Sequence, residues 1–184
     1  MTEIDVELYK YTKLFERIQN AKKEWNDGEH VRTYFSGTFY NGVYGMQHLF
    51  SGYVSKDAFN SPNNKTTRDH FLSARLVFRA MMAEYPELLH DFDGLHQLVK
   101  DCQTTIKITR VQNNGSIKFR VIDEAPRINA LTIDKYDSFG WYHPNHGFLT
   151  EYADGKMISK PFPLKHMVPD WLTQFEKKLL KSGK

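Results

Sequence analysis

The sequence predicts an α+β fold, with a helical N-terminal half to about residue 103, an antiparallel β-meander around 104–160 and a closing helix at about 169–181. Three observations predict it. Apolar residues recur at three- and four-residue steps in the first half, apolar and polar residues alternate from residue 104, and helical spacing returns after Pro169. With 184 residues, 40% of them hydrophobic, we expect one domain with its own core.

The N-terminal half opens with an amphipathic helix over residues 4–26, predicted to end at Asn26-Asp27-Gly28. Residues 31–60 are rich in aromatic side chains but contain several glycines, each of which weakens a helix by roughly 1 kcal/mol. Both a broken helix and a pair of short strands are compatible with this segment. Residues 61–65 have the composition of a loop.

A second long helix is predicted over residues 67–85, with Thr66 as its cap and Asp69 in its first turn. It should end before Pro86, since the residue before a proline avoids the helical region. Pro86 then suits the first turn of another helix, which runs to about residue 102.

Strands are predicted in the second half. The runs at 104–111 and 116–122 flank Asn113-Asn114-Gly115 and predict a β-hairpin. Two further turn signals, at 144–147 and at 154–155, separate short strand-like runs. The closing helix should place Trp171, Phe175 and Leu179 inward.

Composition excludes several classes. A single cysteine, Cys102, excludes an intrachain disulfide and a cysteine-rich zinc site, and it is typical of a reducing compartment. The sequence shows neither a signal peptide nor an apolar run long enough to span a membrane, so we expect a cytoplasmic protein with no membrane partner. The net charge of +3 is compatible with a phosphate-bearing partner without requiring one.

The predicted helix 67–85 carries the main candidate site. Asp69 and His70 would act as Mg²⁺ ligand and general base at the start of the helix. Guanidinium groups match phosphate oxygens, and lysines of the closing helix would extend a DNA footprint. The predicted nucleic-acid-binding residues are Arg68, Arg75, Arg79, Lys177, Lys178 and Lys181. The same residues also fit an ordinary capped core helix with a solvated arginine border.

Two other motifs have mainly structural interpretations. His143 and His146 have a spacing usable by a metal ion, but they lie in a predicted turn and are expected to be exposed. Asp154-Gly155-Lys156 matches half of a nuclease motif, and a hairpin turn explains it as well.

Four segments carry a resemblance to a known group of proteins. They are TTRDHFLSARLVFRAMM at 66–82, DFDGL at 91–95, TIKITRVQNN at 105–114 and FPLKHMVPDWLTQFEKKLL at 162–180. Together they resemble small proteins encoded by large tailed bacteriophages, marine ones included, over about residues 60–180. Ala74 stands where the group's pattern has proline. Because such phages carry many free-standing homing endonucleases, the resemblance implies a role on nucleic acid in the host-cell cytoplasm.

The function expected from these observations is a phage-type DNA endonuclease of the homing kind, which hydrolyses phosphodiesters with Mg²⁺. Two alternatives remain open: a non-catalytic nucleic-acid-binding or host-directed phage protein, and a virion or scaffold component whose aromatic segment 33–59 packs against a partner. A homo-oligomer is compatible with each of them.

Overall fold

The protein is described here by a computed structural model, which covers residues 3–24, 29–46, 48–85, 87, 91–120, 128–131 and 133–182. The α-helices are α1 (Glu3–Glu24), α2 (Glu29–Tyr44), α3 (Lys56–Phe59), α4 (Ala74–Glu84), α5 (Phe92–Gln103), α6 (Arg110–Ser116) and α7 (Asp170–Ser182). The strands are β1 (Leu49–Ser55), β2 (Thr66–His70), β3 (Thr104–Thr109), β4 (Ile117–Arg120), β5 (Ile128–Leu131), β6 (Trp141–His143), β7 (Gly147–Ala153) and β8 (Lys156–Ser159). Short 3-10 helices are η2 (Asn63–Lys65), η4 (Ile133–Phe139) and η5 (Lys165–Met167).

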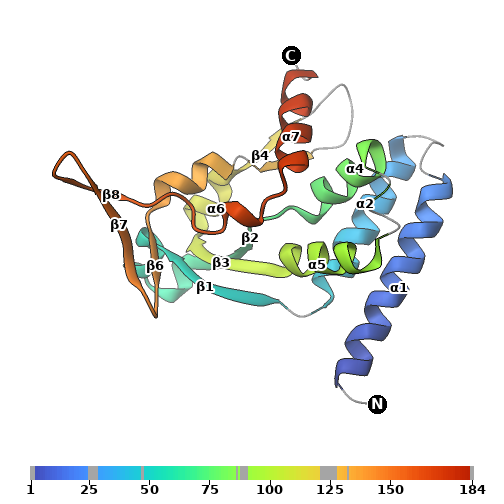
Figure 1. Cartoon of the computed structure of the whole chain (residues 1–184), viewed down its shortest axis with the longest axis horizontal. Helices are drawn as coiled ribbons and strands as arrows, with labels where there is room; N and C mark the ends of the chain where they lie inside the picture. Colours follow the sequence, from blue (N-terminus) through green and yellow to red (C-terminus); the bar gives the residue numbers. More distant parts are fainter. Residues whose placement is uncertain are drawn as a thin grey trace.

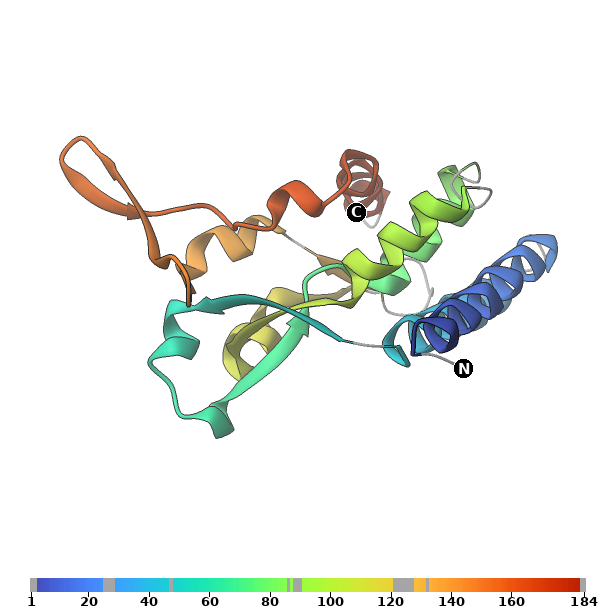
Figure 2. The same cartoon turned by 60° about the horizontal axis from the view of Figure 1, so that its bottom comes forward.

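A six-stranded mixed sheet runs through the molecule in the order β2-β3-β1-β6-β7-β8. Only β1 and β3 pair in parallel among these neighbours, and the other pairs are antiparallel. Strands β4 and β5 form a separate small sheet. Helices α1, α2, α4 and α5 gather at one end, and the β7–β8 hairpin projects at the other (Figures 1 and 2).

The helical end forms around α4, which packs against α2 and α7. Ser73 caps α4, because its hydroxyl accepts a hydrogen bond from the Leu76 amide at 3.4 Å. Phe78 of α4 is buried and stacks on Phe39 of α2, with ring centroids 4.9 Å apart. Gly42 lets α1 approach α2 closely, since a Cβ at that position would lie 2.7 Å from a methyl carbon of Leu14.

The α+β class is confirmed, as are the first helix, the closing helix and the antiparallel order of β6, β7 and β8. The predicted turn at 154–155 is also confirmed: Asp154 and Gly155 both have positive φ, 51° and 72°, as a tight hairpin turn requires. Segment 31–60 matches neither alternative in full, because an unbroken helix, α2, is followed by a single strand, β1, and the short helix α3. The predicted ends at 26–28 and at Pro86 lie outside the described residues.

The prediction of one helix over 67–85 is wrong in its first part. Residues Thr66–His70 form the edge strand β2, which pairs along its whole length with β3, from Thr66 opposite Thr109 to His70 opposite Thr105. The cap is therefore Ser73, not Thr66. Tertiary pairing with β3 outweighs the local helical pattern here, as it commonly does for short segments.

The predicted hairpin of 104–111 with 116–122 is also wrong. Helix α6 occupies the predicted turn, and β4 pairs with β5 instead of β3. Thr109 and Gln112 explain the helix. The backbone N–H of Gln112 donates to the Thr109 hydroxyl, and the backbone N–H of Thr109 donates to the side-chain Oε1 of Gln112, each at 3.0 Å. This reciprocal pair is a capping box, and it starts α6 where the sequence predicted a turn.

Candidate functional site

Asp69 and His70, the predicted catalytic pair, are consecutive on β2 and contact different parts of the molecule. Successive side chains of a strand point to opposite faces. Asp69 faces the core side, opposite the buried Ile106 of β3, whereas His70 lies on the outer face, opposite Thr105. The structure therefore does not bring the two side chains to one point.

Asp69 is held by Tyr136 of η4, whose hydroxyl donates to Asp69 Oδ2 at 2.9 Å. Burial raises the pKa of Asp69 from 3.8 to about 6, and the hydrogen bonds from Tyr136 and from the His70 backbone act in the opposite direction. Asp69 is thus partly shielded from solvent, beside the nearly fully buried Tyr136.

His70 shares a hydrogen bond with His48, the residue before β1: His48 Nδ1 and His70 Nε2 are 2.9 Å apart. The His70 ring also stacks on Tyr44 of α2, with centroids 3.9 Å apart and planes inclined by 22°. Burial and the neighbouring His48 together lower the pKa of His70 from 6.5 to about 4. The His70 ring is therefore neutral at pH 7, and it is fixed on two sides.

Basic and aromatic side chains lie beside this histidine pair on the outer face of β2, β3 and β1. The Arg68 guanidinium lies over the Phe50 ring, 4.8 Å from its centroid. Lys107 is opposite Arg68 in the ladder, and its Nζ donates to Asn63 Oδ1 at 2.9 Å. We call this set the outer sheet face. It consists of His48, Phe50, Arg68, His70 and Lys107.

The outer sheet face is accessible to solvent. His48, Phe50 and Arg68 are exposed, and His70 and Lys107 are partly buried. Phe50 is 41% exposed and belongs to the large hydrophobic residues that the described part of the chain leaves in solvent. A flat ring, a guanidinium, an ammonium and two imidazoles are thereby presented together on one rigid surface.

Of the other predicted arginines, Arg75 lies near this face and Arg79 is partly buried on α4. The Arg75 guanidinium lies 4.7 Å from the centroid of Tyr40, which contacts Tyr44 edge to face. Tyr44 in turn stacks on His70, so Arg75 is linked to the outer sheet face through two tyrosines. Arg79 also takes part in an interaction within the structure.

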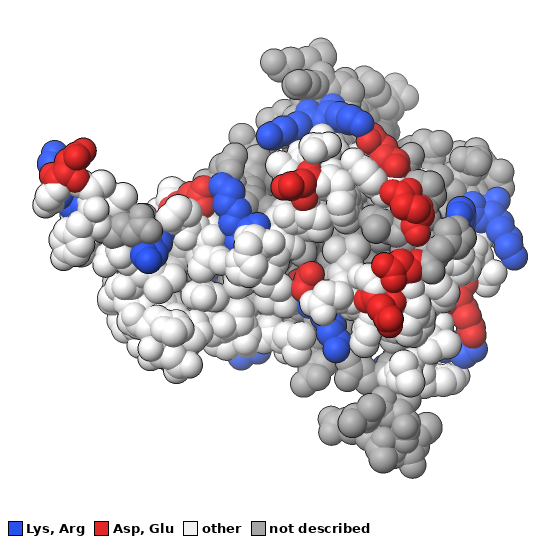
Figure 3. Space-filling model, viewed as in Figure 1, with Lys and Arg blue, Asp and Glu red and all other residues white. Residues whose placement is uncertain are grey.

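The predicted lysines of the closing helix lie away from the outer sheet face. In Figure 1, α7 lies at the top of the molecule, whereas β1 lies in its lower half. Lys178 pairs with Glu84 of α4, Lys177 is exposed, and the Lys181 side chain lies outside the described part. In Figure 3, lysine and arginine side chains are scattered with acidic side chains between them. The six predicted basic residues therefore do not form one continuous patch.

Sequence reasoning missed His48 and Lys107, and it did not place Phe50 beside Arg68. Two sequence signals point to them. HLFSGYVS at 48–55 contains Phe, Tyr and Val, which favour strands, and TTR at 66–68 is too rich in β-branched threonine to favour a helix. Treating both segments as strands beside 104–109 places His48, Phe50 and Arg68 on one sheet.

Within the described residues, no three side chains of His, Cys, Asp or Glu gather as a metal site. Two histidine pairs do occur. His48 and His70 point nitrogen to nitrogen, whereas the rings of His143 and His146 stack with centroids 4.9 Å apart. His143 Nδ1 accepts a hydrogen bond from the Asn145 amide at 3.2 Å, so this second pair is built into the β6–β7 turn.

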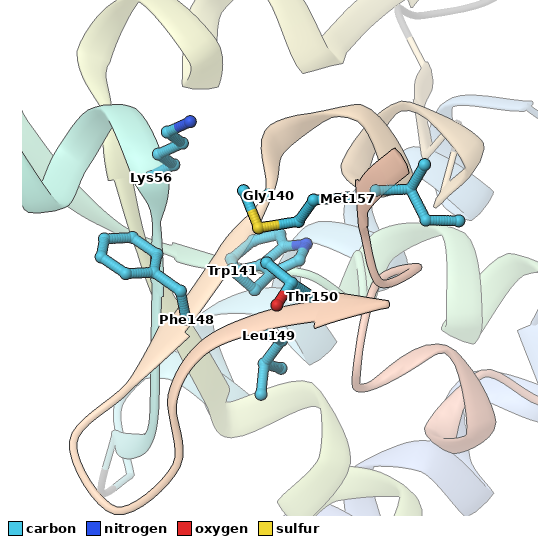
Figure 4. Close-up of a pocket in the computed structure, with 8 residues that line it drawn as sticks. Lys56, Gly140, Trp141, Phe148, Leu149, Thr150 and Met157 are labelled. Atoms are coloured by element: carbon cyan, nitrogen blue, oxygen red, sulfur yellow. The ribbon is translucent and has the colours of Figure 1, made fainter. Parts of the chain in front are cut away.

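A cavity of about 350 Å³ lies at the other end of the sheet, where the hairpin projects. Its lining comes from the start of α3 and from β6, β7 and β8, as Figure 4 shows. Trp141, Phe148, Met157 and Ile158 make most of the surface apolar, and Lys56 adds one amine. None of the residues predicted from the sequence as catalytic or nucleic-acid-binding lines this cavity.

Within the described parts of the chain, no helix combines the length and apolar character needed to cross a bilayer. Comparison with known protein families, with curated proteins and with solved structures gives no match to this chain.

Proposed function

We propose that the protein binds single-stranded nucleic acid across the outer sheet face. The observation that carries the proposal is the Arg68 guanidinium lying over the exposed Phe50 ring, with Lys107 opposite Arg68 in the same ladder. Surfaces that bind single strands combine cations for the phosphates with flat groups on which bases stack. The outer sheet face has both kinds of group on three adjacent strands, β2, β3 and β1.

Each side chain has a role in this proposal. Arg68 and Lys107 contact phosphate oxygens, and the Arg68 fork suits two oxygens of one phosphate. Phe50 and the guanidinium plane above it offer stacking surfaces to unpaired bases. In a duplex the base faces are stacked on one another and inaccessible, so the preferred ligand is single-stranded nucleic acid.

The metal-dependent cleavage expected from Asp69 and His70 is not part of this proposal. That reaction requires both side chains at one phosphate, and their contacts are with Tyr136 on the core side and with His48 on the outer side. Binding needs only the outer face. Incubating the same samples with Mg²⁺ and running a gel tests cleavage in the same experiment.

The test is fluorescence anisotropy with labelled single-stranded and duplex oligonucleotides at several salt concentrations. We expect the single strand to bind more tightly, and Arg68→Gln to weaken binding about tenfold, a loss typical of one charge-assisted contact. Arg68→Gln should also reduce the slope of log affinity against log salt by about one phosphate contact. Phe50→Ala should weaken binding without changing that slope.

Matched controls exist elsewhere in the chain. Lys177→Gln removes one positive charge from α7, and Phe59→Ala removes a ring that is 47% exposed near the hairpin. Neither should change the affinity. Equal losses for Arg68→Gln and Lys177→Gln would mean that binding follows overall charge, and the outer sheet face would then have no special role.

A further inference from the structure

We propose that His48 and His70 bind a divalent transition-metal ion between them, through Nδ1 of His48 and Nε2 of His70. The two nitrogens approach each other from separate elements, the segment before β1 and the end of β2, at 2.9 Å. The ion would replace the proton that the two nitrogens share. Both nitrogens then present lone pairs, and each ring carries its proton on its other nitrogen, so no net proton is lost from two neutral imidazoles.

The nitrogen separation suits one shared ion. Two nitrogens that each bind a Zn²⁺ ion at about 2.0–2.1 Å lie about 2.9 Å apart at a right angle and about 3.3 Å apart in a tetrahedron. The observed 2.9 Å lies at the lower bound of this range. The ring planes are inclined by 54°, so the rings are not stacked and their edges face one another. A small rotation of the exposed His48 ring would aim both lone pairs at one point.

Stacking on Tyr44 prepares His70 for metal binding. It fixes the plane of the ring, which reduces the conformational entropy lost on binding. Imidazole nitrogens select zinc, copper, nickel or cobalt over Mg²⁺, whose preferred ligands are oxygens. The metal proposed here therefore differs in kind and place from the Mg²⁺ expected at Asp69.

Among the described residues no third protein ligand of the usual kinds completes the site, so further coordination positions stay open to water or to a phosphate oxygen. Arg68 and Lys107 lie on the same face. A bound ion would add a positive charge to that face. Metal binding itself does not depend on the proposed nucleic-acid binding, and each is tested separately.

The experiment is isothermal titration of Zn²⁺ into the tag-free full chain at about pH 7.5, in a buffer that does not bind metal. We expect one ion per chain. His48→Ala and His70→Ala should each weaken it by more than about tenfold, since even an outer partner of a metal ligand is worth about 10–100-fold in affinity. Circular dichroism of each variant checks the fold, and His48 is exposed enough for its replacement to be tolerated.

The second histidine pair supplies the matched control. His143→Ala combined with His146→Ala also removes two neighbouring imidazoles, and this variant should keep full affinity for Zn²⁺. Absorption of Co²⁺ added to the chain gives a second readout, because nitrogen ligands change its visible spectrum. The proposal is overturned if the wild type binds no ion, if binding survives His48→Ala, or if binding is lost with His143 and His146 instead.

Discussion

Asp69 and His70 are neighbours on β2 whose pKa values are shifted in opposite senses on opposite faces of the sheet. Burial beside Tyr136 raises the pKa of Asp69 to about 6, and burial beside His48 lowers the pKa of His70 to about 4. Between about pH 4 and 6 the folded protein keeps a proton on Asp69 that the unfolded chain has lost. Over much of the same range it lacks a proton on His70 that the unfolded chain binds.

The pKa shifts of Asp69 and His70 change the free energy of unfolding in opposite directions as pH rises. The Asp69 contribution falls as pH rises through this window, and the His70 contribution falls as pH drops through it. Together they should leave the free energy of unfolding nearly independent of pH between about 4.5 and 6, as far as these two groups determine it. Urea unfolding in the presence of EDTA at several pH values measures it.

Asp69→Asn should separate the two contributions. With Asp69 unable to titrate, the variant should gain stability as pH rises from about 4 to 6.5, because only the His70 effect remains. His70→Gln should do the reverse: its free energy of unfolding should fall by on the order of 2 kcal/mol as pH rises through the range in which Asp69 ionises. His166→Gln, on the exposed η5, is the control. Two parallel curves for Asp69→Asn and His70→Gln would contradict the prediction.

Gln112 should be important for stability although it is only partly buried. Its Oε1 accepts from the Ser55 hydroxyl at 2.7 Å and from the Thr109 amide at 3.0 Å, and its Nε2 donates to Asp57 at 3.1 Å. Gln112→Ala removes these bonds and leaves the fully buried Ser55 hydroxyl without that acceptor. We expect a loss of about 2–3 kcal/mol in chemical denaturation.

Val111→Ala is the control for Gln112→Ala. Val111 is the preceding residue on α6 and is 81% exposed, so Val111→Ala should change stability by less than about 0.5 kcal/mol. If both alanine variants were equally stable, the network at Gln112 would contribute nothing measurable.

Gly52 and His143 should be energetically coupled. Gly52 in β1 has φ of 86°, and a Cβ there would lie 2.5 Å from His143 Nε2. Gly52→Ala therefore adds a clash to the strain of a positive φ, and we expect a loss of about 2–3 kcal/mol. Gly147→Ala tests strain alone, because its φ is 66° with open space around it, and should cost about 1 kcal/mol.

A double-mutant cycle separates the two terms at Gly52. In a His143→Ala background, Gly52→Ala should cost about as much as Gly147→Ala, since only backbone strain remains. An unchanged cost in both backgrounds would locate the penalty in the backbone and not in the contact with His143.

Cys102 should be inert in the folded protein. Its thiol is fully buried on α5, and burial raises its pKa well above the usual range, with a smaller contribution from Asp101. Since the thiolate is the reactive form, a disulfide reagent should label the native chain only at the rate of unfolding. In about 6 M guanidinium chloride the single cysteine should react at once. Rapid labelling of the native protein would show that α5 opens locally.

The parts of the fold that follow from local chemistry could be predicted from the sequence. The spacing of buried residues along α1, the turn at Asp154-Gly155 and the amphipathic α7 are local features. Strand β2 could not be predicted so easily, because its state depends on a partner distant in the sequence. At α6, the capping box of Thr109 and Gln112 competed with the turn signal at Asn113-Asn114-Gly115. β2 exists because β3 pairs with it, and the residues that separate them in sequence form α4 and α5.

The candidate site was only partly predictable for the same reason. Arg68, His70 and Arg75 were identified from their chemistry, but their arrangement was derived from a helix that starts too early. A one-residue step changes the angle by 100° on a helix and by 180° on a strand. The error in secondary structure therefore placed Asp69 and His70 together, and the structure separates them. The endonuclease activity, the Mg²⁺ ion and the bacteriophage origin stay predictions.

The position of β1 between strands made later in the chain has a consequence for how the protein is synthesised. β1 lies between β3 and β6, so one of its hydrogen-bonding edges has no partner until the ribosome has produced residue 109, and the other has none until it has produced residue 143. At about 5–20 residues per second, that interval lasts several seconds. During it, LFSGYVS is an exposed strand able to pair with other nascent chains. Truncated products ending before β6 should therefore be the ones that aggregate and require chaperones.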